Sequence, residues 1–243
     1  SLIEQICTHA FAEPNEYIQI LMSPYYRWAS LFKNTRYTSD RFIVLVAIQK
    51  DGCALKYASD KLRGDREIIL AAVQQSQRAF SYATEELRGD REVVLETCLQ
   101  NGRALEYASR ELRGDREIVL EVVQQDGDAL ICALPELWGD REVVLAAVQQ
   151  YGYLLQYATE ELCGDQDIVL AAVQQDGYAL RYASDELSGD REIVLTAVKQ
   201  NGLALLFASE KLRGDREVVL VAGQQNRTAL MYASRELVYQ LVE

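Results

Sequence analysis

Residues 189–213 read GDREIVLTAVKQNGLALLFASEKLR, and units of this kind recur along most of the chain. The opening Gly-Asp pair is found at 64, 89, 114, 139, 164, 189 and 214, always 25 residues apart. One register fits eight copies over residues 39–238 without insertion or deletion, the first copy beginning with Ser39 and Asp40. So strict a period is typical of units that stack on one another. We number the positions of each repeat from 1 to 25, starting at the glycine of the Gly-Asp pair, and we number the repeats from 1 to 8 in chain order.

The first half of each unit predicts a helix that begins after the Asp at position 2. Its carboxylate can accept hydrogen bonds from the first helical turn, and an acidic residue usually follows at position 4. Positions 5, 6, 7, 9 and 10 are apolar and cover about 200° of a helical wheel, at about 100° per residue. We therefore expect this helix to be buried on more than one side, as in the interior of a stack.

The second half predicts another helix. An Asp-Gly or Asn-Gly pair near positions 13 and 14 is expected to end the first helix, with its glycine left-handed, and to cap the second helix. Positions 16, 17, 20 and 24 then share one buried face. Because strong helix formers fill both halves and period-two alternation is absent, the sequence favours an all-α fold over β-solenoids and leucine-rich repeats. We predict an α-solenoid, or superhelix, of eight 25-residue helix-turn-helix repeats.

The two ends of the chain fall outside the repeat register. Residues 1–38 are interpreted as an N-terminal helical cap or the remnant of a preceding domain, and residues 239–243 as a C-terminal tail. Ser23 followed by Pro24 is typical of a helix start. The domain organisation predicted from the sequence is therefore cap, eight tandem repeats over 39–238, and tail.

Composition argues against several classes of function. The net charge of -12, from 25 basic and 37 acidic residues, makes nucleic acid an unlikely partner. No stretch reaches the roughly 20 apolar residues of a membrane span, so a soluble protein is expected. Five cysteines without metal-ligand spacing indicate reduced thiols and a cytoplasmic, reducing compartment. With His9 as the single histidine and no phosphate-binding loop, we expect no enzyme, no metal site and no cofactor.

The repeat resembles a known family. The runs Val-Leu-x-Ala-Val and Ala-Leu-x-Tyr-Ala-Ser, the latter intact at 179–184, resemble the tandem helical repeat catalogued as a domain of unknown function, DUF4116. The resemblance covers residues 39–238. It implies a tandem binding module, found in protist proteins and in secreted effectors of intracellular bacteria, without catalytic residues to transfer. An effector of this kind would act in the host cytosol.

Positions that vary among the eight copies indicate where the scaffold makes the fewest demands. Positions 15, 18, 22 and 25 vary freely and would share one exposed face of a continuous second helix. In repeats 1 to 3 this face predicts a partner-binding basic strip of Lys56, Arg63, Arg78, Arg88, Arg103, Arg110 and Arg113. In repeats 4 to 6 it predicts, with two neighbouring residues, a partner-binding aromatic patch of Ile131, Leu134, Trp138, Tyr151, Tyr153 and Tyr178.

Two residues near this patch break local rules. Tyr151 replaces the Asp, Asn or Ser of position 13 and forfeits a cap worth about 0.5 to 2 kcal/mol. Pro135 falls late in the second helix and would cost ~3 kcal/mol unless that helix bends or starts again. Such departures tend to mark functional sites. The alternative is that repeat 4 kinks and its apolar residues pack inward.

Position 19 carries an aromatic ring in every repeat except the fourth, where it is Cys132. The rings flank the buried face of the second helix. Stacking between repeats is the interpretation we prefer, with recognition of single-stranded bases as the alternative.

These patterns predict a non-catalytic scaffold that binds a protein along the variable face of the second helix. One alternative is a targeting or regulatory segment of a larger effector enzyme. Another is binding of an anionic lipid or nucleic acid by the basic strip. The identity of the partner and the oligomeric state are not specified by the sequence.

Overall fold

The computed structural model of the chain describes Phe32, residues 35–235 and Leu237. These residues form helices joined by turns, with no strand among them. The chain divides into two compact units, Ser1–Gln100 and Asn101–Glu243, which are described separately. Most of the predicted N-terminal cap, including Ser23, Pro24 and His9, and the whole predicted tail lie outside the described residues. In the part that the structure describes, no helix is long and apolar enough to cross a membrane.

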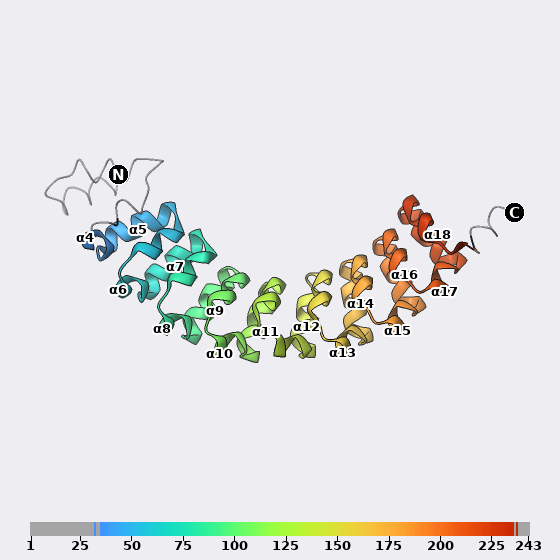
Figure 1. Ribbon diagram of the computed structural model, residues 1–243, viewed down its shortest axis with the longest axis horizontal. Coiled ribbons are helices and arrows are strands. Elements are labelled where there is room, and N and C mark those ends of the chain that lie inside the picture. The colour runs from blue at the N-terminus through green and yellow to red at the C-terminus, as the bar shows by residue number, and fades with distance from the viewer. Residues whose placement is uncertain (1–31, 33–34, 236, 238–243) are drawn as a thin grey trace. The chain divides into compact units, whose positions relative to one another are not determined.

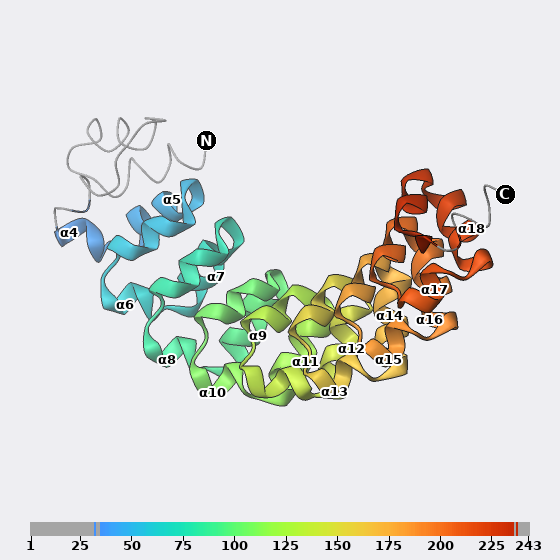
Figure 2. The ribbon, with the colours of Figure 1, turned by 45° about the vertical axis from the view of Figure 1, so that its right-hand side comes forward.

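Each repeat contributes one long α-helix, which begins at position 3. In the first unit these helices are α5 (Arg41–Lys50), α7 (Arg66–Gln75) and α9 (Arg91–Gln100), preceded by the short α4 (Thr35–Thr38). In the second unit they are α11 (Arg116–Gln125), α12 (Arg141–Val148), α14 (Gln166–Gln175), α16 (Arg191–Gln200) and α18 (Arg216–Gln225). Within the second unit the long helices lie side by side in chain order in both views (Figures 1 and 2).

Two short helices complete each of repeats 1 to 7, and the first of the two is also present in repeat 8. The first is a 3-10 helix that ends at position 19: η1 (Gly52–Tyr57), η2 (Gln77–Tyr82), η3 (Gly102–Tyr107), η4 (Gly127–Cys132), η6 (Gly152–Tyr157), η7 (Gly177–Tyr182), η8 (Gly202–Phe207) and η9 (Arg227–Tyr232). The second is an α-helix of four residues: α6 (Asp60–Arg63), α8 (Glu85–Arg88), α10 (Arg110–Arg113), α13 (Glu160–Cys163), α15 (Asp185–Ser188) and α17 (Glu210–Arg213). Repeat 4 has the 3-10 helix η5 (Pro135–Gly139) in its place.

The prediction of one continuous second helix is therefore wrong, because the chain becomes extended between the two short helices. Ala183 at position 20 has φ -66° and ψ 154°, and Ser184 has φ -60° and ψ 160°. The extended backbone turns the Ser184 N–H toward the preceding repeat, where it donates to the Cys163 carbonyl at 2.9 Å. The same bond joins Ser209 to Ser188 at 2.9 Å. The break thus supplies a backbone link between neighbouring repeats.

The predicted caps of the long helices are confirmed. In repeat 7, Asp190 Oδ1 accepts from the backbone N–H groups of Glu192 at 2.9 Å and Ile193 at 3.0 Å. The buried positions are 5, 6, 9 and 10, and in α16 these are Ile193, Val194, Ala197 and Val198. Leu195 at position 7 is only half-buried. The long helix is thus buried over a broad arc, as its apolar pattern predicts.

The glycine of position 14 serves a different purpose from the one predicted. No described glycine has a positive φ, so none takes the left-handed conformation. A Cβ on Gly177 would instead lie 2.4 Å from the Ala197 carbonyl oxygen of the next repeat. For Gly152 and Ala172 the corresponding distance is 2.3 Å. At Gly177 and Gly152 a side chain is therefore excluded because the next repeat packs directly against this backbone, whereas repeat 2 carries Gln77 at the same position.

Side chains of the constant positions also join neighbouring repeats. Arg141 at position 3 bonds Asp165 at 2.9 Å and Asp167 at 2.6 Å, which hold positions 2 and 4 of the next repeat. The position-12 amide of Gln200 accepts from the Gly177 N–H at 2.6 Å and donates to the Gln175 carbonyl at 3.1 Å. Equivalent bridges to positions 2 and 4 start from Arg41, Arg116 and Arg191, whereas Arg66 bonds Glu92 and Glu96 at positions 4 and 8. The constant residues are therefore used to assemble the stack.

Candidate interaction surface

The predicted basic strip is split between the two units. In the first unit, Lys56 and Arg78 are exposed, and Lys56 Nζ lies 4.7 Å above the centre of the Tyr57 ring. Arg63 and Arg88, both at position 25, are half-buried instead. Their Nε atoms are buried without a hydrogen-bond partner in the described part of the chain. Only two of these four residues therefore present their charge freely at the surface.

In the second unit, Arg103 and Arg110 are exposed, and Arg113 at position 25 is half-buried. Arg113 Nε donates to the Cys132 carbonyl of the next repeat at 2.8 Å. The expectation that position 25 lies on the exposed face is therefore wrong. Because the second helix is interrupted, the spacing from position 18 to position 25 no longer places both on one face.

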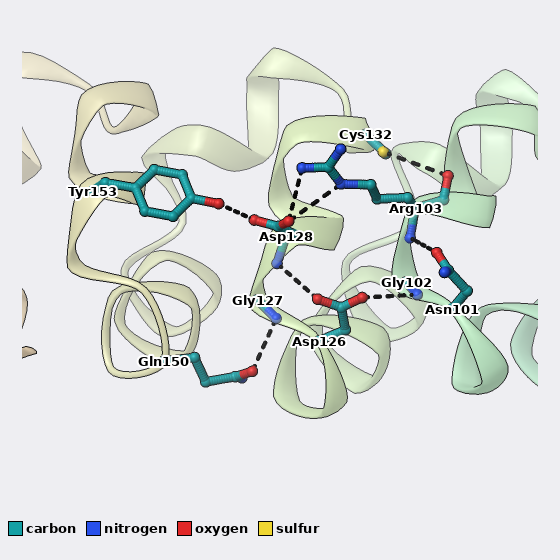
Figure 3. Close-up of polar contacts among 9 residues, drawn as sticks. All are labelled: Asn101, Gly102, Arg103, Asp126, Gly127, Asp128, Cys132, Gln150 and Tyr153. Carbon is teal, nitrogen blue, oxygen red and sulfur yellow. Dashed lines mark hydrogen bonds and ion pairs between the residues drawn. The ribbon is translucent and has the colours of Figure 1, made fainter.

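Three position-15 residues of consecutive repeats form a polar chain in the second unit (Figure 3). Arg103 donates to Asp128 Oδ2 from Nε at 3.2 Å and from Nη2 at 2.8 Å. The Tyr153 hydroxyl donates to the other oxygen of Asp128. Burial, followed by the hydrogen bond to Asp128, raises the pKa of Tyr153 to about 12. The phenol is therefore held neutral as a donor, and the Asp128 carboxylate is engaged on both sides.

The six residues of the predicted aromatic patch form separate contacts. Tyr151 and Tyr178 are exposed, whereas Ile131, Leu134, Trp138 and Tyr153 are half-buried. The rings of Tyr151 and Tyr153 lie 6.0 Å apart between centres. Two further ring contacts join patch residues to position-19 rings, Trp138 to Tyr157 at 5.8 Å and Tyr178 to Phe207 at 5.8 Å.

Trp138 packs inward, in line with the repacking alternative. Its Nε1 donates to the Leu130 carbonyl at 3.2 Å, so the indole is held against its own repeat. Leu134 Cδ1 lies 3.0 Å from the point where Gly114 would carry a Cβ, so this side chain packs on the start of repeat 4. Both contacts lie within repeat 4, and among these contacts only that of the Trp138 ring with Tyr157 reaches the next repeat.

The two departures from local rules have different outcomes. Pro135 is the first residue of η5, where a helix starts again and a missing N–H costs nothing. Tyr151 provides no cap, whereas Asp126 and Asp176 accept from the N–H two residues ahead at 3.2 Å and 2.9 Å. Ser76 makes no such bond either. The fold therefore accommodates Pro135, whereas Tyr151 lacks the capping hydrogen bond that an Asp makes at this position.

A half-open hollow of about 460 Å³ lies at Cys132 in the second unit. Cys132 occupies position 19, which carries a ring in the other seven repeats. Burial, the largest cause, raises the pKa of the Cys132 thiol, and its sulfur contacts the Arg103 carbonyl at 3.7 Å (Figure 3). The hollow is lined by Arg103, Glu106, Arg113, Ile131, Cys132 and Tyr157.

Several residues of this surface were not predicted from the sequence. Leu206 and Met231 at position 18 are 43% and 78% exposed, more than any residue of the predicted patch. Asp128 was overlooked although it stands 25 residues from both Arg103 and Tyr153. The contacts of Asp128 could have been predicted from the sequence, because the same position in adjacent repeats lies side by side in a stack. The hollow at Cys132 could be suspected only from the missing ring of position 19.

Groups suited to metal binding are absent from the described residues, which contain no cluster of three or more His, Cys, Asp or Glu side chains. Cys53, Cys98, Cys132 and Cys163 are all free thiols. His9 and Cys7 lie outside the described residues.

The family model described as domain of unknown function (DUF4116) matches residues 40–88, 90–138, 140–188 and 190–238. Each match runs from position 2 of one repeat to the end of the next, so the family unit spans two 25-residue repeats. No curated protein and no solved structure matches the chain.

Proposed function

Since the chain belongs to the DUF4116 family of tandem repeats, we propose that it is a non-catalytic scaffold that binds a protein partner along its variable face. This variable face consists of positions 15, 18 and 22 in each repeat. The observation that carries the proposal is that constant and variable positions have different uses in the repeat. Positions 2, 3, 4, 12 and 14 are used in bonds between repeats, and the variable positions are mostly surface residues.

The chemistry of the variable face supports protein recognition. Position 22 is exposed in all eight repeats, and position 18 is exposed in six of them. In the second unit the face combines exposed Tyr178, Leu206 and Met231 with charged residues such as Arg103 and Arg110. Exposed aromatic and apolar side chains beside arginine are the usual anchors of protein interfaces. Within each unit, repetition of this face along the stacked repeats would give an extended surface for a partner.

Selection of a random peptide display library on the immobilised full chain tests this function. The test variant carries Tyr178→Glu and Leu206→Glu on the variable face. Its matched control carries Gln174→Glu and Gln224→Glu, at exposed position 11 of the long helices. We expect enriched peptides that bind the control as well as the parent chain but bind the test variant at least about tenfold more weakly. Failure to enrich any peptide, or peptides that bind both variants equally, would refute the proposal.

Two further functions remain as alternatives. Exposed Lys56 and Arg78 support binding of an anionic lipid or nucleic acid, although Arg63 is paired with Asp60 and Arg103 with Asp128. Retention on heparin at physiological salt would support this alternative, and elution below that salt would exclude it.

The other alternative is a targeting or regulatory segment of a larger effector enzyme that acts in the host cytosol. The four cysteines of the described residues are free thiols, which supports a reducing compartment for the protein.

A further inference from the structure

The hollow at Cys132 is a place where the repeat lacks a side chain that its other copies have. Position 19 is Tyr in six repeats and Phe in one, and only repeat 4 has a cysteine. The surrounding backbone keeps the common form, since η4 ends at Cys132 as η3 ends at Tyr107. A cysteine side chain is much smaller than a phenol. The volume that a ring would occupy is therefore left open at the surface.

The walls of the hollow suit an aromatic ring. Ile131 and Tyr157 supply apolar surface, and the Tyr157 ring is supported by Trp138 at 5.8 Å between centres. The floor is Cys132, which is 8% exposed. Because burial raises the pKa of its thiol, the floor is neutral. A ring entering from solvent would thus meet a neutral floor and the rigid Tyr157 ring.

The rim of the hollow favours acidic groups beside that ring. Arg113 uses its Nε for the Cys132 carbonyl, and its two Nη atoms have no ion pair among the described residues. Arg103 lies on the same rim, with its charge shared with Asp128. Glu106 is the one acidic residue of the lining and can accept a hydrogen bond from a phenol. Arginine forms strong bidentate bonds with carboxylates, so Arg113 is the main attractive charge for a ligand.

We propose that the Cys132 hollow binds the ring of a Tyr in a partner peptide whose neighbouring residues are acidic. The ring would take the place of the missing position-19 side chain, and a flanking carboxylate would bind the terminal nitrogens of Arg113. This inference rests on the proposed scaffold function and names the class of partner for one part of the variable surface. It requires no covalent step.

Direct binding of short peptides to the full chain tests the inference. The probe is acetyl-Glu-Glu-Tyr-Glu-Glu-amide, compared with the same peptide carrying Ala in place of Tyr and with one carrying Gln in place of each Glu. We expect the Tyr peptide with Glu to bind at least about tenfold more tightly than the Ala peptide, and more tightly than the Gln peptide. Equal binding of the Tyr and Ala peptides, or no binding of the Tyr peptide, would overturn the inference.

Substitutions at Cys132 provide the matched pair. Cys132→Tyr restores the residue that six other repeats carry and should fill the hollow, so binding should fall at least about tenfold. Cys132→Ala leaves the hollow open, so binding should stay within about threefold. Undiminished binding by Cys132→Tyr, with a melting temperature like that of the parent chain, would refute the inference.

Arg113→Gln provides a second test in case the Cys132→Tyr chain does not fold. It should abolish the preference for the Glu-flanked over the Gln-flanked peptide while the preference for Tyr over Ala persists. A preserved Glu preference would refute the role of Arg113. If display peptides bind the variable face but the Tyr peptide does not bind the chain, or binds Cys132→Tyr as well as the parent chain, the hollow inference fails and the scaffold function stands. If no peptide of either kind binds, both fail.

Discussion

The close approach at position 14 makes a strong prediction for Gly177→Ala. The new Cβ would lie 2.4 Å from the Ala197 oxygen, 2.9 Å from Gln200 Oε1 and 3.0 Å from Asn201 Cβ. Ordinary contact begins at 3.4 Å, so the backbone of repeat 7 must retreat by about 1 Å. Overpacking costs about 1–3 kcal/mol, and loss of the Gln200 bond to the Gly177 N–H adds about 0.5–1.5 kcal/mol. We expect the free energy of unfolding to fall by about 2–4 kcal/mol.

Gly164→Ala is the matched control for this change. Its Cβ would meet the Glu161 oxygen at an ordinary 3.4 Å, and its φ of -100° suits alanine. Reduced freedom of the unfolded chain should stabilise this variant by about 0.4–1 kcal/mol. With a urea m-value of ~2 kcal/mol/M, the two unfolding midpoints should differ by at least about 1 M, as followed by circular dichroism. Equal midpoints would refute the argument that glycine is kept for repeat packing.

Three further predictions concern the polar contacts between repeats. Gln166→Arg should bridge to Asp190 and Glu192 and raise the melting temperature by no more than roughly a few degrees, a gain that 1 M NaCl should largely remove; a salt-insensitive gain would contradict the bridge. Asp126→Ala should destabilise the chain by about 1–3 kcal/mol, more than Asp176→Ala, because Asp126 also accepts from Gly102 at 3.0 Å; equal midpoints in urea would contradict this second role. The pKa of Tyr153 is about 12 in the folded chain and about 10 in the unfolded chain, so the stabilisation from its neutral phenol is complete below pH 10 and is lost between pH 10 and 12. Tyr153→Phe should therefore flatten the decline of the urea midpoint over that pH range. An unchanged decline would count against the Asp128 bond.

The candidate surface was only partly predictable. Exposed Tyr178 and Arg103 followed from the variation among repeats, because positions free of packing demands are free to diverge. The half-burial of Arg63 and Arg113 did not follow, since it depends on the break after position 20 that turns position 25 toward the next repeat. Trp138 was assigned to the surface for the same reason. No helical wheel drawn on an uninterrupted helix could have placed these residues correctly.

The sequence alone determined the helical class, the eight-unit register and the start of each long helix. These features depend on local chemistry: apolar spacing suits a helix, and a carboxylate at position 2 reaches the N–H groups of the same turn, as in Asp190. Only the tertiary structure decided why Gly177 must be glycine, which variable residues reach solvent and where the Cys132 hollow opens. Those features depend on distances between one repeat and the next, and such distances are set by the packing of residues 19 or more positions apart.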